Sequence, residues 1–333
     1  MGPGVISWFC VLGLVGCGAA AASEAAVPDA ELEAVDAPAP PPLQPLTADE
    51  QRLRGEVEGE VGALAAFGPR NLAQSWNLAE ATDHVARRLE GFGYTVNRQG
   101  FAVGEDVLQN LEVALPGNQA ETVVIAAHYD SAPGSPGVNA GATGAAVLLS
   151  LAKELRGQRF ERAVRLVWLA NESVGQGVPG SAAYEQTLRQ EGVQVVATLT
   201  LGSLGRYSLL DGSQRYPEEL LYGSEGRTHF GNFIAVLSNA SSHGLLDRIR
   251  PALARASLPV EELVLPDGAP LAAEGPQARF WKAGLAGLVL TDTAQFRATE
   301  HDGPQDTLDK VDFDRLARVA WLLRPLLEQL AGP

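Results

Sequence analysis

Cysteine and basic residues are scarce in this chain of 333 residues. The only two cysteines, Cys10 and Cys17, lie near its start, so the remainder can form neither an internal disulfide nor a thiolate zinc site. Lys and Arg together number 25 against 40 Asp and Glu, which gives a formal net charge of −15. This balance argues against binding to nucleic acid, because such contacts need clustered basic side chains.

The rest of the composition is that of a folded globular protein. Hydrophobic residues make up 46% and charged residues 20% of the chain, and 36 Gly and 21 Pro are not arranged in repeats. These values exclude a collagen-like chain and a chain that is disordered throughout. They favour one large α/β domain.

The amino-terminal segment has the features of an export signal. Residues 5–16 form an apolar run of twelve residues, too short for a helix that crosses about 30 Å of hydrocarbon but typical of a signal-peptide core. The run ends in Leu14-Val15-Gly16-Cys17, which resembles the lipobox of bacterial lipoproteins, where cleavage precedes a cysteine that becomes lipid-modified. We therefore expect a lipoprotein signal peptide over residues 1–17, with Cys17 as the lipidation site.

This assignment leaves alternatives, because the first nine residues contain no Lys or Arg. An uncleaved amino-terminal anchor, or a start codon assigned too early, would also account for the apolar run. Residues 18–46 are dominated by Ala, Pro and acidic residues and predict an extended tether. The expected location is outside the cytoplasm, with the protein held through its lipid at the periplasmic or outer-membrane face.

The folded domain is expected to cover residues 47–333. Thr47 and Glu50 have the spacing of a capping box and predict the start of its first helix. Apolar strands are then expected to alternate with helices, which indicates a mixed or mostly parallel sheet covered on both faces. The expected strands are 123–127, 164–170, 195–201, 233–237, 260–265 and 285–291, and the expected helices after the first are 83–89, 144–155, 181–189 and 313–330.

Polar residues follow several of these strands directly. The first strand is followed by His128-Tyr129-Asp130, the second by Asn171-Glu172-Ser173 and the third by Gly202-Ser203. Since ligands bind at the carboxyl ends of parallel strands, we expect these loops and residues 291–297 to meet at one edge. A histidine two residues before an aspartate suits a metal ligand oriented by a carboxylate, and equally an ordinary hydrogen-bonded loop histidine.

The order of short motifs from about residue 68 to 330 resembles a known family. HYDS, SPG, NE, GNFIA, TDTAQFR and DTLDK follow one another as in the zinc-dependent exopeptidases of the aminopeptidase and glutamate-carboxypeptidase type, peptidase family M28. The resemblance implies a three-layer α/β/α sandwich with a mixed, mostly parallel central sheet. It also implies a site with two zinc ions and five protein ligands in typical members.

Three residues of the family's site are retained. The resemblance implies that His128 matches the first zinc ligand and that Asp130 matches the carboxylate that orients it. Glu172 matches the general base, which takes a proton from the zinc-bound water.

The other ligand positions depart from the family pattern. Ala140 stands at the bridging aspartate, Ser173 at the second carboxylate and Gly202 at the fourth ligand. Asp302 stands at the final histidine, and His301 beside it would serve only if the loop shifted. A catalytic zinc needs three protein ligands, so tight zinc binding is not expected.

These departures favour a membrane-tethered member that is not catalytic and binds a peptide or protein partner. In that hypothesis no cofactor is expected, and His128, Asp130 and Glu172 are vestigial. A second hypothesis is an active metallopeptidase or aminohydrolase, in which one zinc is held by His128, Glu172 and Asp302 or His301. A third uses Ser173 or Ser203 as a nucleophile with His128 and Asp130. A purely structural role in the cell envelope is a fourth.

Overall fold

The computed structural model describes residues 40–173, 177–217, 220, 227–266, 269 and 275–332. Cys17, the expected signal peptide and most of the expected tether lie outside these residues. Within the described part, no helix is both long and apolar enough to cross a membrane. The first helix, α1 (Ala48–Ala65), follows Thr47, and the capping box between Thr47 and Glu50 is formed as predicted.

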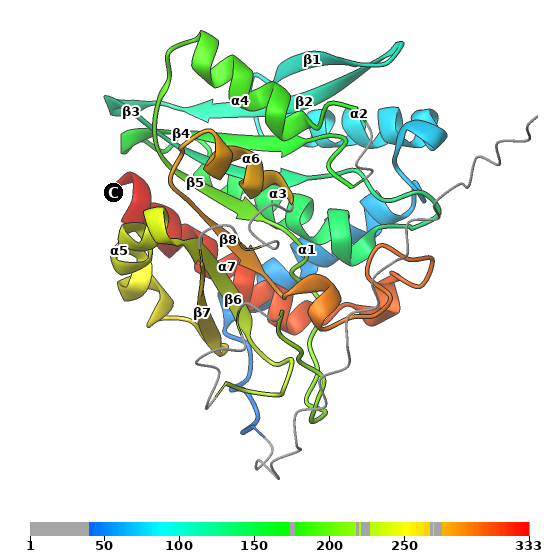
Figure 1. The fold of residues 1–333 in the computed structure, drawn as a ribbon, viewed down its shortest axis with the longest axis vertical. Helices are drawn as coiled ribbons and strands as arrows, with labels where there is room; N and C mark the ends of the chain where they lie inside the picture. Colours follow the sequence, from blue (N-terminus) through cyan, green and yellow to red (C-terminus); the bar gives the residue numbers. More distant parts are fainter. Residues whose placement is uncertain are drawn as a thin grey trace, which may run out of the picture. The chain divides into compact units, whose positions relative to one another are not determined.

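A single eight-stranded sheet forms the centre of the domain, in the order β1-β2-β4-β3-β5-β8-β6-β7 (Figure 1). Strands β4, β3, β5 and β8 run parallel to their neighbours in that group, whereas β1–β2, β2–β4 and β8–β6 are antiparallel. The predicted mixed, mostly parallel sheet is confirmed. The strands are β1 (Asn97–Val103), β2 (Asp106–Leu115), β3 (Gly117–His128), β4 (Phe160–Leu169), β5 (Gln194–Leu201), β6 (Ile234–Asn239), β7 (Val260–Leu265) and β8 (Gly287–Thr291).

Helices cover both faces of this sheet. On one face α1, α3 and α7 pack together, α2 contacts α3, and α5 packs on α7; on the other face α4 packs against α6. The predicted three-layer α/β/α sandwich is therefore confirmed. The further helices are α2 (Ser75–Gly91), α3 (Thr143–Leu155), α4 (Gly180–Gln190), α5 (His243–Leu253), α6 (Gly275–Lys282) and α7 (Phe313–Ala331).

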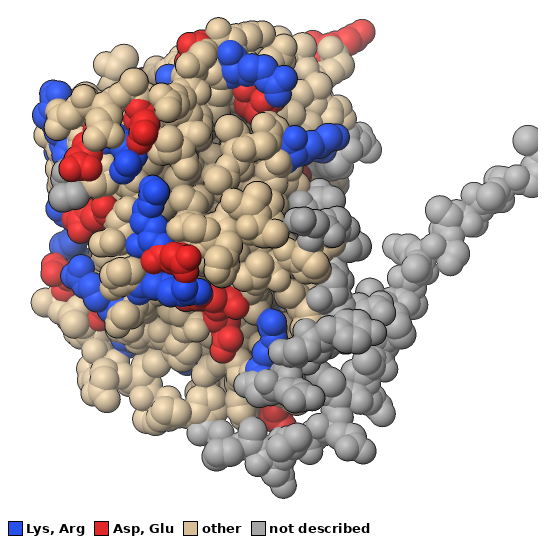
Figure 2. Space-filling model, turned by 60° about the vertical axis from the view of Figure 1, so that its left-hand side comes forward, with Lys and Arg blue, Asp and Glu red and all other residues tan. Residues whose placement is uncertain are grey.

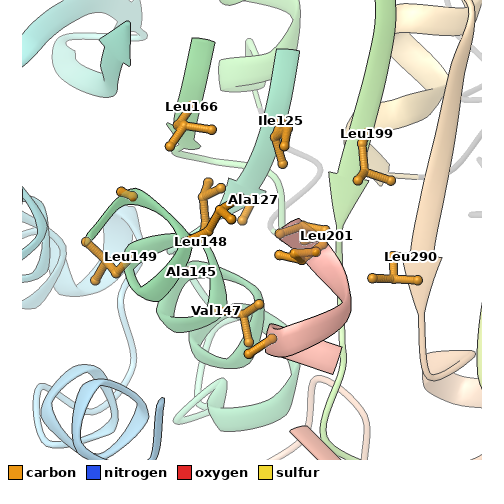
Figure 3. Packing of buried hydrophobic residues seen from close by; sticks show 14 of the residues in the cluster. Ile125, Ala127, Ala145, Val147, Leu148, Leu149, Leu166, Leu199, Leu201 and Leu290 are labelled. Atoms are coloured by element: carbon orange, nitrogen blue, oxygen red, sulfur yellow. The ribbon is translucent and has the colours of Figure 1, made fainter. Parts of the chain in front are cut away.

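The central strands are apolar on both faces, which explains their continuous hydrophobic runs. Ile125 and Leu199 belong to the core cluster that includes Leu148 of α3, and Figure 3 shows these side chains gathered between the sheet and that helix. The alternate residues Val124 and Ala126 point to the other face and join a cluster with side chains of α4 and α6. α3 is thus buried against the strand ends that carry the candidate site.

Charged side chains of both signs are interspersed on the surface. On the face drawn in Figure 2, Lys and Arg lie beside Asp and Glu, with wide areas of other residues between them. The acidic balance of the composition is therefore not gathered into one patch on that face.

Candidate functional site

The loop after β3 folds back tightly onto the end of its own strand. Gly137 has a φ of +56°, and a Cβ atom there would lie 2.2 Å from the Cβ of Ser131. A Cβ atom at Gly141 would lie 2.1 Å from the carbonyl oxygen of Asp130. Only glycine fits at these two positions, which lets the loop enter a π-helical turn (Val138–Ala142) and then α3.

Arg70 fastens this loop to the domain. Its side chain is fully buried and donates hydrogen bonds to five backbone carbonyls, those of Leu64, Gly68, Tyr129, Pro136 and Gly137. Burial lowers the pKa of Arg70 to about 10, and the nearby carboxylates of Asp130 and Asp306 oppose that effect. The guanidinium therefore stays charged at neutral pH.

Two buried aspartates connect the loops of neighbouring strands. The Asp306 carboxylate accepts hydrogen bonds from the backbone N–H groups of Asn139 (2.8 Å) and Ala140 (3.0 Å). Asp292 accepts from the side-chain amide of Asn139 (2.8 Å) and from the N–H of Arg206 (2.7 Å). The loops after β3, β5 and β8 therefore meet at one edge, as their shared direction predicts.

A cavity of about 350 Å³ opens at this edge. The residues that the motif resemblance matches to the family's ligands and general base all line this cavity, whereas Asp130 is fully buried behind His128. The residues at these positions are His128, Ala140, Glu172, Ser173, Gly202 and Asp302, and His301 lines the cavity as well. Residues far apart in the chain are thus brought together where the motif order places them.

His128 is held by a carboxylate beneath the cavity. Its Nδ1 lies 3.2 Å from Oδ1 of Asp130, whose Oδ2 accepts the N–H of Ser173 at 2.9 Å. Burial lowers the pKa of His128, but the hydrogen bond and charge of Asp130, together with Glu172 and Asp302, outweigh it and raise the pKa above its usual value.

The same ring nitrogen also faces the hydroxyl group of Ser173. Ser173 Oγ lies 3.4 Å from Nδ1 of His128, the nitrogen that Asp130 already contacts. A serine relay needs the nucleophile on Nε2 and the carboxylate on Nδ1. The geometry therefore disfavours Ser173 as a metal-free nucleophile, and Ser203 only lines the cavity.

Glu172 is tied to the start of α4. Its Oε1 accepts the backbone N–H of Ser181 at 2.5 Å, and its Oε2 accepts the Ser181 hydroxyl at 3.0 Å. Burial raises the pKa of Glu172 to about 7, and the charge of Asp130 adds to this rise, whereas the Ser181 hydrogen bonds oppose it. At neutral pH the carboxyl group is thus close to half protonated.

Three polar atoms around the cavity have no hydrogen-bond partner in the described part of the chain. They are Oγ1 of Thr200, Nδ1 of His301 and Oδ1 of Asp302. Thr200 is only 3% exposed. His301 Nε2 lies 3.4 Å from the other Asp302 oxygen, and Asp302 has a left-handed φ of +57°. Buried polar groups in proteins are nearly always paired, so the hydroxyl of Thr200 is the clearest candidate to bind a ligand, whereas the side chain of Asp302 is 41% exposed and reaches solvent.

The described residues do not fit a catalytic zinc ion. No three of their His, Cys, Asp or Glu side chains are grouped so that they could hold a metal. Ala140, Ser173 and Gly202 supply no charged oxygen, and a catalytic zinc needs three protein ligands. A Cβ atom at Gly202 would meet nothing within 4 Å, so there is space for a carboxylate side chain that the sequence does not provide.

Comparisons with known proteins agree with this fold. Residues 110–327 match the model of peptidase family M28. An uncharacterised protein of Escherichia coli K12, YfbL, is 26% identical over an alignment of 266 residues, and the alignment covers 75% of this chain and 80% of that protein.

Solved structures of proteins with two different activities share the fold. The LapA aminopeptidase of Legionella pneumophila superposes with a TM-score of 0.66 at 14% identity, covering 86% of this chain and 74% of that one. A glutaminyl cyclase of Porphyromonas gingivalis gives a TM-score of 0.63 at 16% identity, covering 83% of this chain and 98% of that one. At such low identity these structures show the architecture and not the reaction.

The sequence analysis did not identify the residues that hold this site in place by hydrogen bonds. Ser181 and Arg70 carry no motif that marks them, since their roles depend on contacts formed only in the fold. The repeated aspartates of DTLDK and TDT were visible signals, and Asp306 and Asp292 of these motifs hold backbone and side-chain amides.

The raised pKa of Glu172 predicts a pH-dependent stability. The folded chain binds this proton more tightly than the unfolded chain, whose carboxyl group has a pKa near 4.5, so stability is lost as pH rises from about 4.5 to about 7. Glu172→Gln removes this titration. Relative to wild type, the variant should gain about 2 kcal/mol in unfolding free energy between about pH 5 and about pH 8.

Urea denaturation at both pH values measures this difference. Glu90→Gln, which changes an exposed carboxylate on α2, is the matched control and should track wild type. An equal offset of Glu172→Gln from wild type at both pH values would contradict the raised pKa.

Proposed function

This chain belongs to peptidase family M28, and we propose that it is a non-catalytic member whose cavity binds a peptide or protein partner. The observation that carries the proposal is the donor set on the cavity wall. Ala140, Ser173 and Gly202 occupy three ligand positions of the family without a side chain that could bind zinc.

The retained base cannot compensate for the missing metal. In a zinc hydrolase the ion lowers the pKa of the attacking water and polarises the carbonyl, and the described residues at this edge offer no group of side chains that would hold such an ion. Both oxygens of Glu172 accept hydrogen bonds from Ser181, and at neutral pH the carboxyl group is only partly ionised. Glu172 therefore holds the start of α4 more effectively than it could activate water.

A cavity of about 350 Å³ is open to a ligand at this edge. Its wall carries unpartnered polar atoms on Thr200, His301 and Asp302, and the hydroxyl of Thr200, which is buried, costs free energy while it is unpaired. A ligand that supplies hydrogen bonds to them would gain affinity for that reason. This supports a binding role over a purely structural one.

A second candidate is an active metallopeptidase or aminohydrolase with a rearranged zinc site. The observation that favours it is the His301–Asp302 pair, which lines the same cavity as His128 and Glu172. A shift of the loop that carries His301 would be needed to group these side chains around one ion.

We also propose that the protein is exported and held at a membrane through lipid on Cys17. The lipobox-like sequence and the lack of any cysteine after position 17 support this anchor. Labelled palmitate should enter the wild-type protein in bacterial cells and should not enter Cys17→Ser. Cys10→Ser is the control and should be labelled like wild type. Equal labelling of Cys17→Ser would rule out the anchor.

Restoring the missing ligands tests the proposal. The combined variant Ala140→Asp, Ser173→Glu, Gly202→Glu and Asp302→His should be less stable than wild type by roughly a few kcal/mol without metal, because carboxylates crowded at one edge repel one another. Zinc should reverse this loss, since only the folded chain offers the site. Melting curves with and without zinc measure both effects.

A neutral variant of similar size provides the control. Ala140→Asn, Ser173→Gln, Gly202→Gln and Asp302→Asn together should show no response to zinc. If zinc fails to stabilise the acidic variant, the assignment of these positions is wrong. If zinc stabilises wild type and His128→Ala abolishes the effect, the rearranged zinc site is favoured instead.

A further inference from the structure

The cavity continues well beyond the strand ends that carry the family's ligand positions. It is lined by Gly202 at the end of β5, by Val289 of β8, by Leu237 of β6 and by Leu263 and Leu265 of the edge strand β7. Adjacent strands are about 4.8 Å apart, and β7 is three strands away from β5, so this branch extends for about 14 Å.

The branch has an apolar floor and an apolar roof. Val289, Leu237 and Leu263 belong to a hydrophobic cluster that is separate from the main core and includes Trp281 of α6. Trp281 is fixed by a hydrogen bond from its indole N–H to the carbonyl of Gly287 at 3.0 Å. The unpartnered hydroxyl of Thr200 lies between this branch and the strand ends.

The entrance of the cavity, formed by His301 and Asp302, is polar, and its unpartnered atoms accept hydrogen bonds. When Nε2 of His301 donates to Asp302, Nδ1 of the same ring is left as an acceptor, and Oδ1 of Asp302 is also an acceptor. Glu172, which is only partly ionised at neutral pH, lines the same cavity. A primary ammonium group offers three donors and a positive charge, and so matches this entrance.

We infer that the cavity binds a single-chain amphiphile, a primary ammonium group on an unbranched apolar chain of about ten carbons. An extended carbon chain advances ~1.25 Å per carbon, so about ten carbons fill the branch, and no amino-acid side chain is that long. The inference rests on the non-catalytic part of the proposed function, in which the cavity binds without hydrolysis, and it puts this amphiphile in the place of the peptide or protein partner. A peptide backbone would place several amide groups against the apolar side chains of Val289, Leu237 and Leu263.

A series of n-alkylamines with four to twelve carbons tests the length of the apolar part. Isothermal titration calorimetry, below the micelle concentration of each amine, should show affinity rising about fourfold per added methylene until about ten carbons, and then no further. The N-acetylated amines should bind more weakly at every length, because they lack the charge and two of the donors. Leucine amide and trileucine amide form the peptide arm of the series.

Substitutions on β7 show where the alkyl chain of the bound amine ends. Leu263→Phe narrows the far end and should move the plateau to shorter amines, while Leu263→Ala should move it to longer ones. Val264→Phe is the matched control, because Val264 is the next residue on β7 and is 40% exposed rather than buried. Asp302→Asn should weaken all amines by the same factor and leave the plateau where it is.

The outcomes separate this inference from the proposed function. A plateau at four or five carbons, trileucine amide binding far more tightly than leucine amide, or a plateau that ignores both Leu263 variants would overturn the single-chain ligand and leave a peptide ligand standing. The absence of measurable binding by any amine would overturn it as well. Zinc-dependent hydrolysis of the peptide amides would instead overturn the non-catalytic function.

Discussion

The buried guanidinium of Arg70 sets the position of the loop after β3, which carries part of the cavity wall. It donates to carbonyls on both sides of the loop after β3, at Tyr129 and at Gly137, and to two carbonyls at the end of α1 and beyond. Backbone carbonyls in such a tight, glycine-containing loop could not all find partners from regular secondary structure. One side chain thus donates hydrogen bonds to carbonyls along this loop. His128 and Ala140 are held at the two ends of that loop.

The buried carboxylates at this edge are stabilised by hydrogen bonds from backbone and side-chain groups of the protein. Asp130 is balanced by His128 and by the N–H of Ser173, and Asp306 by two N–H groups at the start of the π-helical turn. Burial raises the pKa of Asp306 and of Glu172, so both bind protons more readily than exposed carboxyl groups do. Hydrogen bonds offset the charge of Asp130 and Asp306, and the raised pKa values of Asp306 and Glu172 reduce the negative charge of these two groups further.

The alternation of the central strands and helices along the chain was predictable from the sequence, because buried parallel strands are continuously apolar. The first two strands were missed, since β1 lies at the edge, is mainly exposed and carries the polar sequence NRQGFAV. Helix α5 was missed because Pro251 lies within it, and α6 because it is short. The motifs predicted which loops meet, but the Ser181 clamp on Glu172 and the apolar branch toward β7 depend on packing that no local pattern encodes.

The central claim is that the cavity has lost zinc chemistry and kept the capacity to bind. The most direct test is to purify the full-length protein without chelator, determine zinc per chain by elemental analysis, and measure release of amino-terminal residues from peptides with added zinc. The account predicts far less than one zinc per chain and no release above the rate in buffer. One or two tightly held zinc ions, together with hydrolysis that Glu172→Gln abolishes, would contradict it.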